Sequence, residues 1–509
     1  MILKTLKLTN FRGYKDTIEI QFTDLTAFVG KNDVGKSTIL EALDIFFNDG
    51  KNIIKIDKTD VNVFAAGEDN TETIIAAVFD DLPERVVIDT TYETTLSEEY
   101  LLNSDGLLEV SKHYNSGGSP KVFIRAKHPT ATNCAGLLSK KITELRQILA
   151  RNDIQCENQT ICSVIRKAIW AHYSDNLGLS EIEIEIAKED TKKIWDNLST
   201  YLPLYFLFQA DRKNSDGDDE VQDPLKDAVK EILQEQAIRD KLEEVASIVK
   251  AKLTEVSNHT MEKLREMDPS VANSLNPILP NTTSLKWADV FKNVSIAGDE
   301  IPINKRGSGV KRLILLNFFR AEAERKATEG GRAQIIYAIE EPETSQHTTN
   351  QIILIRALKS LASAENVQVI ITTHSSTIVK ELDFADLKLI IKGDDGIRQI
   401  MNVQPGQLCY PSLNEVNYIA FEEATIEYFN ELYGFLEYSG WFGQYKSQQA
   451  LRPYIKEDRN GNRVVQQIST TEYIRHQIHH PENTYNTQYT KAELLSSIQS
   501  MRTYIDNLP

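Results

Sequence analysis

Residues 30–38, GKNDVGKST, have the types and the spacing of a loop that binds phosphate groups. Gly30 and Gly35 allow the backbone to turn tightly, so that consecutive N–H groups point at a phosphate. Lys36 then reaches the β- and γ-phosphates, and Ser37 offers its hydroxyl to Mg²⁺. The pattern therefore predicts a site for ATP and Mg²⁺. The predicted contact residues are Gly30, Lys31, Asn32, Asp33, Gly35, Lys36, Ser37 and Thr38.

Two carboxylates follow a short apolar run later in the chain. Residues 334–339, QIIYAI, are typical of a buried strand, and Glu340 and Glu341 come directly after it. We expect Glu340 to lie beside the metal and Glu341 to polarise the attacking water. The usual residue at the metal side is Asp. The additional methylene of Glu340 therefore allows an altered Mg²⁺ geometry and slow hydrolysis.

A histidine and a glycine–serine loop are candidates to complete this site. His374 follows the apolar run 367–371, so we expect it at a strand end, where it can contact a γ-phosphate. Residues 305–312, KRGSGVKR, precede a helical pattern, and a helix N-terminus at Ser308 and Gly309 can bind anions. Taken alone, both signals are weak, since a histidine at a strand end more often has a structural role.

The C-terminal segment holds a second set of residues that could do chemistry. Arg475 and His480 lie about one turn apart on a predicted helix that Pro481 ends. Histidine can move protons to and from a ribose 2′-OH, and arginine can neutralise phosphorane charge without a metal. The spacing resembles the R-[NHD]-x(3–5)-H motif of HEPN ribonucleases, whose site a dimer completes. The competing interpretation is a polar helix end that serves as a partner-docking or regulatory surface.

The phosphate loop needs strands and a helix to position it. Alternating apolar residues predict strands over 2–9 and 18–22, and a third strand, 25–29, leads directly into the loop. Residues 39–46 have helical spacing. Apolar runs within 71–83 and from 201 up to Asp211 predict further strands. We therefore expect an α/β fold.

Composition limits the function classes. The chain has 57 Lys+Arg and 74 Asp+Glu among 509 residues, and its net charge of −17 argues against a general nucleic-acid coat but not against a local basic site. The apolar runs are far shorter than the roughly 18 residues of a membrane span, and the start lacks a signal-peptide pattern. Four cysteines without a C-x-x-C pair disfavour a zinc site or a disulfide framework. These features predict a soluble cytoplasmic protein.

We predict four segments. Residues 1–200 form the N-terminal lobe of an ATPase head, 201–285 an inserted helical arm, 286–392 the C-terminal lobe of the head, and 393–509 a mainly helical effector or partner-binding module. The arm is predicted from helical spacing over 224–267, about 65 Å if unbroken. The C-terminal segment lacks the Glu-Gly and Asp-x-Asp pattern of a Toprim nuclease.

The order of these motifs resembles the ATP-binding-cassette ATPases of the SMC/RecF/OLD type, over residues 1–50 and 300–392. The phosphate loop is followed by Gly-Ser-Gly about 270 residues later (308 − 36 = 272), then by Glu-Glu and the strand-end histidine. The resemblance implies a homodimer or higher oligomer of head-to-head subunits with ATP between them. In such a dimer Ser308 of one subunit caps the γ-phosphate held by the other, and His374 is the switch histidine.

The short arm and the runs IRHQIHHPEN and FNELYGFLE also resemble the PtuA ATPases of bacterial Septu and retron antiphage systems. This resemblance implies control of a PtuB-like HNH nuclease and, in retrons, association with a reverse transcriptase and msDNA. Contact with nucleic acid is then local or made by a partner. Two alternatives stay open. One is a self-contained HEPN-like ribonuclease gated by ATP, and the other is a RecF-like DNA-repair ATPase, which the net charge disfavours.

Overall fold

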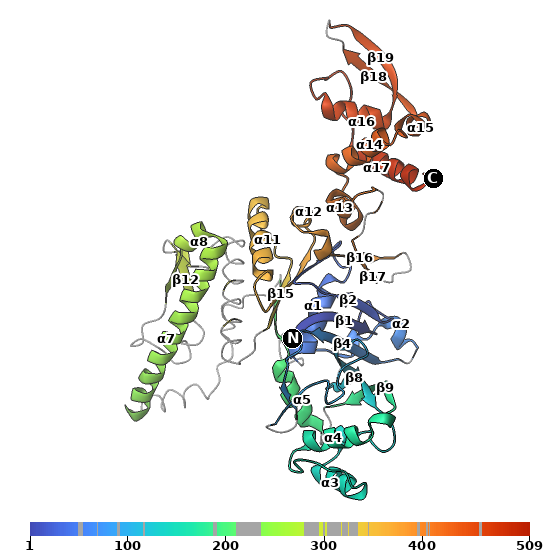
Figure 1. The fold of residues 1–509 in the computed structure, drawn as a ribbon. Coiled ribbons are helices and arrows are strands. Elements are labelled where there is room, and N and C mark those ends of the chain that lie inside the picture. Colours follow the sequence, from blue (N-terminus) through green and yellow to red (C-terminus); the bar gives the residue numbers. More distant parts are fainter. Residues whose placement is uncertain are drawn as a thin grey trace. The chain divides into compact units, whose positions relative to one another are not determined.

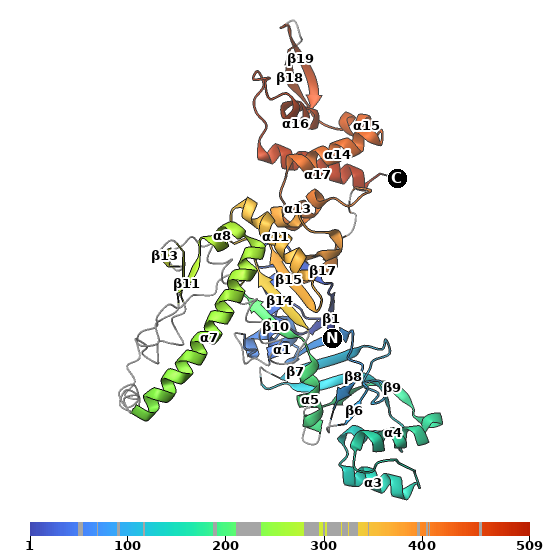
Figure 2. The same ribbon diagram turned by 60° about the vertical axis from the view of Figure 1, so that its left-hand side comes forward.

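The computed structural model of the chain is shown in Figures 1 and 2. It describes residues 1–48, 54–68, 70–88, 92–115, 118–186, 191–209, 236–278, 295–298, 301–302, 317, 324, 334–344, 346–393, 398–403, 406, 408–457 and 461–508. The chain divides into two compact units. The first comprises Met1–Ala27, Gly35–Thr372 and Gly393–Arg398, and the second comprises Phe28–Val34, Thr373–Lys392 and Gln399–Pro509.

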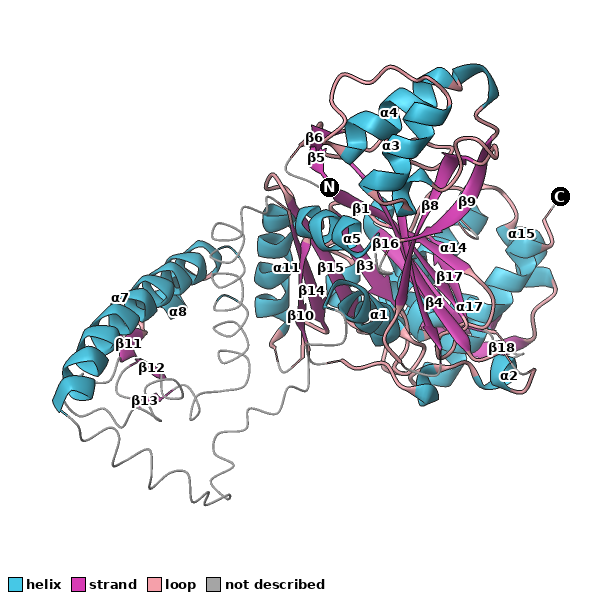
Figure 3. Cartoon of the chain, turned by 90° about the horizontal axis from the view of Figure 1, so that it is seen from below, coloured by secondary structure: helices cyan, strands magenta, loops and turns pink. Residues whose placement is uncertain are grey.

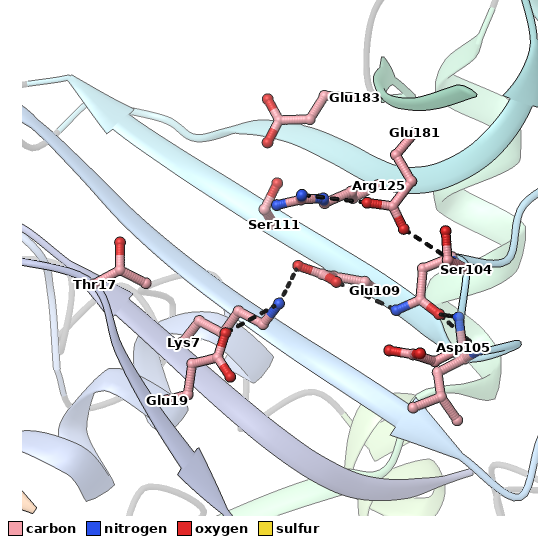
Figure 4. Close-up of polar contacts among 12 residues, drawn as sticks. Lys7, Thr17, Glu19, Ser104, Asp105, Glu109, Ser111, Arg125, Glu181 and Glu183 are labelled. Carbon is pink, nitrogen blue, oxygen red and sulfur yellow. Dashed lines mark hydrogen bonds and ion pairs between the residues drawn. The ribbon is translucent and has the colours of Figure 1, made fainter.

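An antiparallel sheet dominates the N-terminal part of the first unit. Its strand order is β2-β1-β4-β7-β8-β9. The strands are β1 (Ile2–Thr9), β2 (Ile18–Gln21), β4 (Glu72–Asp80), β7 (Leu108–Asn115), β8 (Lys121–Pro129) and β9 (Leu179–Glu185). One face is apolar, with Leu6 and Leu8 fully buried. Another part of the sheet is polar, and Lys7 pairs there with Glu109 at 2.9 Å (Figure 4). The central strands β4 and β7 are buried over most of their length, on both faces of the sheet.

The second sheet has the strand order β10-β14-β15-β3-β16-β17. Its strands are β3 (Leu25–Val29), β10 (Leu204–Phe208), β14 (Ile335–Glu340), β15 (Val367–Thr373), β16 (Leu387–Lys392) and β17 (Arg398–Asn402). Strands β10, β14 and β15 run parallel and in register (Figure 3). Nearly every residue of β14 and β15 is buried, as expected for strands covered on both faces. Their carboxyl ends therefore meet at one edge.

Helices surround these sheets in the first unit. They are α1 (Lys36–Asn48), α2 (Val63–Ala66), α3 (Ile142–Arg151), α4 (Cys162–His172), α5 (Lys192–Leu198) and α11 (Thr348–Ala362). A two-stranded ribbon pairs β5 (Val86–Val87) with β6 (Glu93–Thr94). Within the unit, the Gln368 side chain joins the two large sheets, since its amide accepts from Leu3 N–H at 2.9 Å and donates to Leu3 C=O at 2.9 Å.

The predicted arm contains one long helix. Helix α7 (Gln236–Met267) has 32 residues, a length of about 48 Å, and α8 (Pro269–Asn273) follows it. A small antiparallel sheet of β11 (Asn276–Ile278), β12 (Ser295–Gly298) and β13 (Ile301–Pro302) comes next. The sequence pattern did not predict these three short strands. The part of the predicted arm helix before residue 236 lies outside the described residues.

The second unit ends in a mainly helical module, as predicted. Its helices are α12 (Ser376–Val379), α13 (Leu413–Phe421), α14 (Ile426–Tyr438), α15 (Phe442–Ser447), α16 (Thr470–His479) and α17 (Lys491–Asp506). Helices α14, α16 and α17 lie together (Figure 2). Leu432, Ile474 and Ile498, one on each of these helices, are fully buried in the core. A hairpin of β18 (Leu451–Glu457) and β19 (Arg463–Ser469) was not predicted.

The mixed α/β fold with a helical C-terminal region is thus confirmed. Among the described residues, no helix combines the length and the apolar character needed to cross a membrane.

Candidate nucleotide site

The phosphate loop joins β3 to α1, as the motif predicts. The strand ends at Val29, and the helix begins at Lys36. A Cβ atom at Gly30 would lie 2.6 Å from the backbone oxygen of Ile390, so only glycine fits beside β16. Gly35 has φ +101°, a left-handed conformation that side chains other than hydrogen disfavour. The backbone geometry therefore requires glycine at both positions of the motif.

Arg398 is a residue of this region that the motifs did not reveal. A Cβ atom at Gly35 would lie 3.1 Å from its Cδ, and one at Gly13 would lie 1.8 Å from its Nη1. The guanidinium group therefore packs against two glycines that are close together in the fold and distant in sequence. No local pattern could have predicted this contact.

Lys36 is a buried ammonium group, with 4% of its surface exposed. Burial lowers its pKa, and the nearby carboxylates of Glu341, Glu343 and Glu340 only partly offset this effect. A buried cation gains free energy when an anion approaches, because the anion replaces the water that it has lost. Lys36 is thus suited to bind a phosphate. Glu343, itself 4% exposed, had not been predicted as part of this cluster.

Ser37 and Glu340 meet at the carboxyl end of β14. The Ser37 hydroxyl donates a hydrogen bond to Oε1 of Glu340, the last residue of the strand. The longer Glu side chain therefore does reach the hydroxyl, although Asp is usual at this position. A hydroxyl and a carboxylate oxygen are donors of the kind that Mg²⁺ prefers. The pair consequently fits a magnesium ion bound with a nucleotide.

Glu341 has an unusual backbone conformation, with φ 41°. Its N–H donates to the backbone oxygen of Thr372 at 3.1 Å and lies 3.2 Å from Thr372 Oγ1. Thr372 lies opposite Glu340 in the β14–β15 register. A left-handed conformation costs a residue with a side chain about 1–2 kcal/mol. The neighbouring strand thus holds Glu341 in a conformation that the chain would not adopt freely.

Helix α1, which carries Lys36 and Ser37, is hydrogen-bonded to Tyr205, a residue that the sequence analysis did not identify. The hydroxyl of Tyr205 on β10 donates to the backbone oxygen of Leu40 at 2.6 Å. Burial raises the pKa of Tyr205 well above its ordinary value, and the Asp44 carboxylate adds to the shift. Tyr205 therefore remains a neutral hydrogen-bond donor that supports the first turns of the helix.

Some of the remaining predicted residues of the nucleotide site are described by the structure, and two of them are not. His374 directly follows β15, as predicted, and is exposed, and the next residue, Ser375, caps α12. Lys31, Asn32 and Asp33 lie in the loop after β3, and Thr38 is buried in α1. Ser308 and Gly309 lie outside the described residues.

The Arg475 and His480 side chains have different partners. Helix α16 ends at His479, so that His480 is the residue after its last turn. Nη1 of Arg475 donates to Asn430 Oδ1 at 2.8 Å and contacts Nε2 of His479, whereas His480 Nδ1 lies 3.0 Å from Glu482 Oε1. The structure thus brings Arg475 together with His479, a pairing that the motif did not predict.

Desolvation lowers the pKa of His479, and the charge of Arg475 lowers it further. His479 is therefore mainly neutral at pH 7, a state in which one ring nitrogen can accept a proton.

The chain is similar to known proteins in sequence and in fold. Residues 1–379 match the family described as AAA ATPase domain (AAA_15). No curated protein matches the chain. The SMC head domain from Thermotoga maritima aligns with 80% of this chain and 100% of its own, at 12% identity and a TM-score of 0.36.

Two further solved structures align with the chain. One is an SMC head bound to the C-winged helix domain of ScpA. The alignment covers 79% of this chain and 97% of the SMC head chain, at 13% identity and a TM-score of 0.41. The other is an SMC head with an extended coiled coil, bound to the C-terminal domain of ScpA derived from Pyrococcus furiosus. The alignment covers 82% of this chain and 98% of that SMC head chain, at 14% identity and a TM-score of 0.40.

The family match spans most of the chain, including the phosphate loop, Glu340, Glu341 and His374. The protein therefore belongs to the family of AAA ATPase domains and is an ATPase.

Proposed function

We propose that this ATPase is the regulatory subunit of a bacterial antiphage defence system of the Septu or retron type, similar to PtuA. It binds ATP in a head-to-head dimer and controls a partner HNH nuclease in the cytoplasm. The observation that carries the ATP-dependent part is the cluster of Lys36, Ser37 and Glu340 within one unit. The runs IRHQIHHPEN and FNELYGFLE support the assignment to a defence system.

Each site residue has a proposed role. Lys36 would bind phosphate oxygens, and Ser37 and Glu340 would hold a Mg²⁺ ion, whose charge would neutralise that of the phosphates. Glu341 orients the attacking water. His374 contacts the γ-phosphate, and Ser308 and Gly309 act from the opposite subunit. In a retron, a reverse transcriptase and msDNA join the complex, and contact with nucleic acid is local or made by a partner.

The test is nuclease activity of the chain purified with and without the products of the neighbouring genes. We expect the complex to cut nucleic acid under the control of ATP and the chain alone to cut nothing. In the complex, Lys36→Ala should remove ATP binding and with it the response to ATP, while the partner still assembles. Cleavage by the purified chain at the rate of the complex contradicts the proposal.

A metal-independent ribonuclease is the second candidate function. The observation that favours it is the contact between Arg475 and the neutral His479 near the C-terminal end of α16, next to His480. It predicts RNA cleavage that persists in EDTA and is abolished by His480→Ala or His479→Ala. His113→Ala, on a strand of the other unit, is the control and should leave cleavage intact. Unchanged cleavage in all three variants would assign the activity to other residues.

A further inference from the structure

Helix α13 links the phosphate loop to the C-terminal module within the second unit. The helix is capped at its start by Ser412, whose hydroxyl accepts from the N–H of Glu415 at 3.1 Å. It ends at Phe421, and the capping residue that follows, Glu422, has φ 56° and ψ 30° and donates its N–H to the backbone oxygen of Tyr418 at 2.8 Å. A side-chain-bearing residue is disfavoured in this left-handed conformation. The end of α13 thus has a defined but costly geometry.

The Glu422 side chain reaches the phosphate loop. Its Oε1 lies 2.6 Å from Nζ of Lys31, the residue after the first glycine of the motif. The two side chains are 71% and 48% exposed, so water screens the pair and its strength is modest. A polyanionic triphosphate at the same loop attracts Lys31 and repels Glu422. Nucleotide and Glu422 therefore compete for one ammonium group.

The rest of α13 makes two further connections. Nδ2 of the buried Asn417 donates to the backbone oxygen of Ser376 at 3.3 Å, two residues after His374. On another side, Glu415 accepts from Nη1 of Arg502 on α17 at 3.1 Å. The guanidinium of Arg502 also lies over the ring of Tyr418, 5.0 Å from its centroid. The helix therefore contacts the phosphate loop, the segment after His374 and the C-terminal helix.

We propose that Glu422 is a positioning residue for Lys31, and that ATP binding releases α13 by drawing Lys31 away from Glu422. The state of the nucleotide loop is thereby relayed through α13 to Arg502 and the C-terminal module. By reciprocity, a partner that holds α13 in place weakens ATP binding. The inference rests on the proposed use of ATP as the control signal, but not on the partner's being a nuclease.

The first test is the affinity of the full chain for ATP, measured by equilibrium binding. Glu422→Gln should tighten ATP binding by about two- to five-fold, the range of an exposed ion pair, and the gain should shrink at high salt. Glu423→Gln, the same change at the exposed neighbouring residue, should leave affinity unchanged. In a Lys31→Met background the gain from Glu422→Gln should be clearly smaller, because only the direct repulsion between Glu422 and the triphosphate is then relieved.

The second test is amide hydrogen exchange of residues 413–422 in the full chain. ATP should accelerate exchange in the wild type, whereas Glu422→Gln should exchange faster already without ATP and respond little to it. Three results would overturn the inference: weaker or unchanged ATP binding in Glu422→Gln, the same gain in the Lys31→Met background, or protection of α13 that ATP does not alter. A chain that passes both tests but controls no partner nuclease refutes the proposed function alone.

Discussion

Glu340 and Glu341 are adjacent in sequence but have different surroundings. Glu340 accepts a hydrogen bond from Ser37, while Glu341 has a left-handed backbone conformation and donates its N–H to Thr372. Glu341→Gln should therefore keep ATP binding and slow hydrolysis by about 10²–10⁴-fold, the contribution of a general base. Equilibrium binding and phosphate release measure the two effects.

Glu343→Gln is the matched control for this substitution. Glu343 is a buried carboxylate near the same lysine, but it lies two residues beyond the strand-end pair. Its substitution should slow hydrolysis much less than Glu341→Gln does. If Glu341→Gln hydrolyses ATP at the wild-type rate, another residue polarises the water.

The charge of Lys36 makes the stability of the nucleotide-free protein depend on pH. Burial lowers its pKa below the ordinary 10.5, so the folded chain binds fewer protons than the unfolded chain between the lowered pKa and 10.5. The penalty for burying the charge is therefore complete at pH values below the lowered pKa, and it fades as the pH rises toward 10.5.

Lys36→Met should remove this penalty. Without nucleotide, the variant should have a higher free energy of unfolding than the wild type at pH 7, and the difference should narrow in alkaline solution. Urea denaturation of both proteins across this pH range measures the difference. A variant that is less stable than the wild type at every pH contradicts the expectation.

At the scale of elements, Gln368 on β15 is the polar link between the two large sheets of the first unit. Its amide satisfies both the N–H and the C=O of Leu3, at a point where the pairing of β1 with β4 shifts register. Gln368→Leu leaves both backbone groups without this partner and should lower the free energy of unfolding by about 1–3 kcal/mol. Gln467→Leu on the exposed face of β19 is the control. An equal decrease in the free energy of unfolding in this variant would show that Gln368 has no special role.

The sequence predicts those strands that are marked by an almost uninterrupted run of apolar residues. Strands β3, β14 and β15 are nearly continuous apolar runs, so their ends, and with them Lys36, Glu340 and His374, could be placed in advance. The β18–β19 hairpin could not, because Pro453 interrupts one strand and Val464 and Val465 are exposed in the other.

Contacts between segments that are distant in the sequence could not be predicted either. The pairs Lys31–Glu422 and Gly35–Arg398 form only through the tertiary fold.

At the scale of the whole molecule, the proposed composite site predicts that two defective chains can repair each other. Lys36→Ala removes the phosphate-binding ammonium, and Ser308→Arg blocks the cap that one subunit places over the nucleotide of the other. Each homodimer then has two defective sites and should not hydrolyse ATP. A mixed dimer has one site with the intact loop of the Ser308→Arg chain and the intact Ser308 of the Lys36→Ala chain.

Mixing the two variants should therefore restore ATP hydrolysis. At equal amounts, about half of the dimers are mixed if association is random, and each mixed dimer holds one of two sites intact, so the recovered rate should approach a quarter of the wild-type rate. Adding Glu341→Gln to the Ser308→Arg chain should abolish the recovery, because the rescued site uses that chain's Glu341. The same substitution in the Lys36→Ala chain should not. Recovery that follows the opposite assignment, or no recovery in a mixture shown by mass to contain dimers, would mean that Ser308 does not act across the dimer.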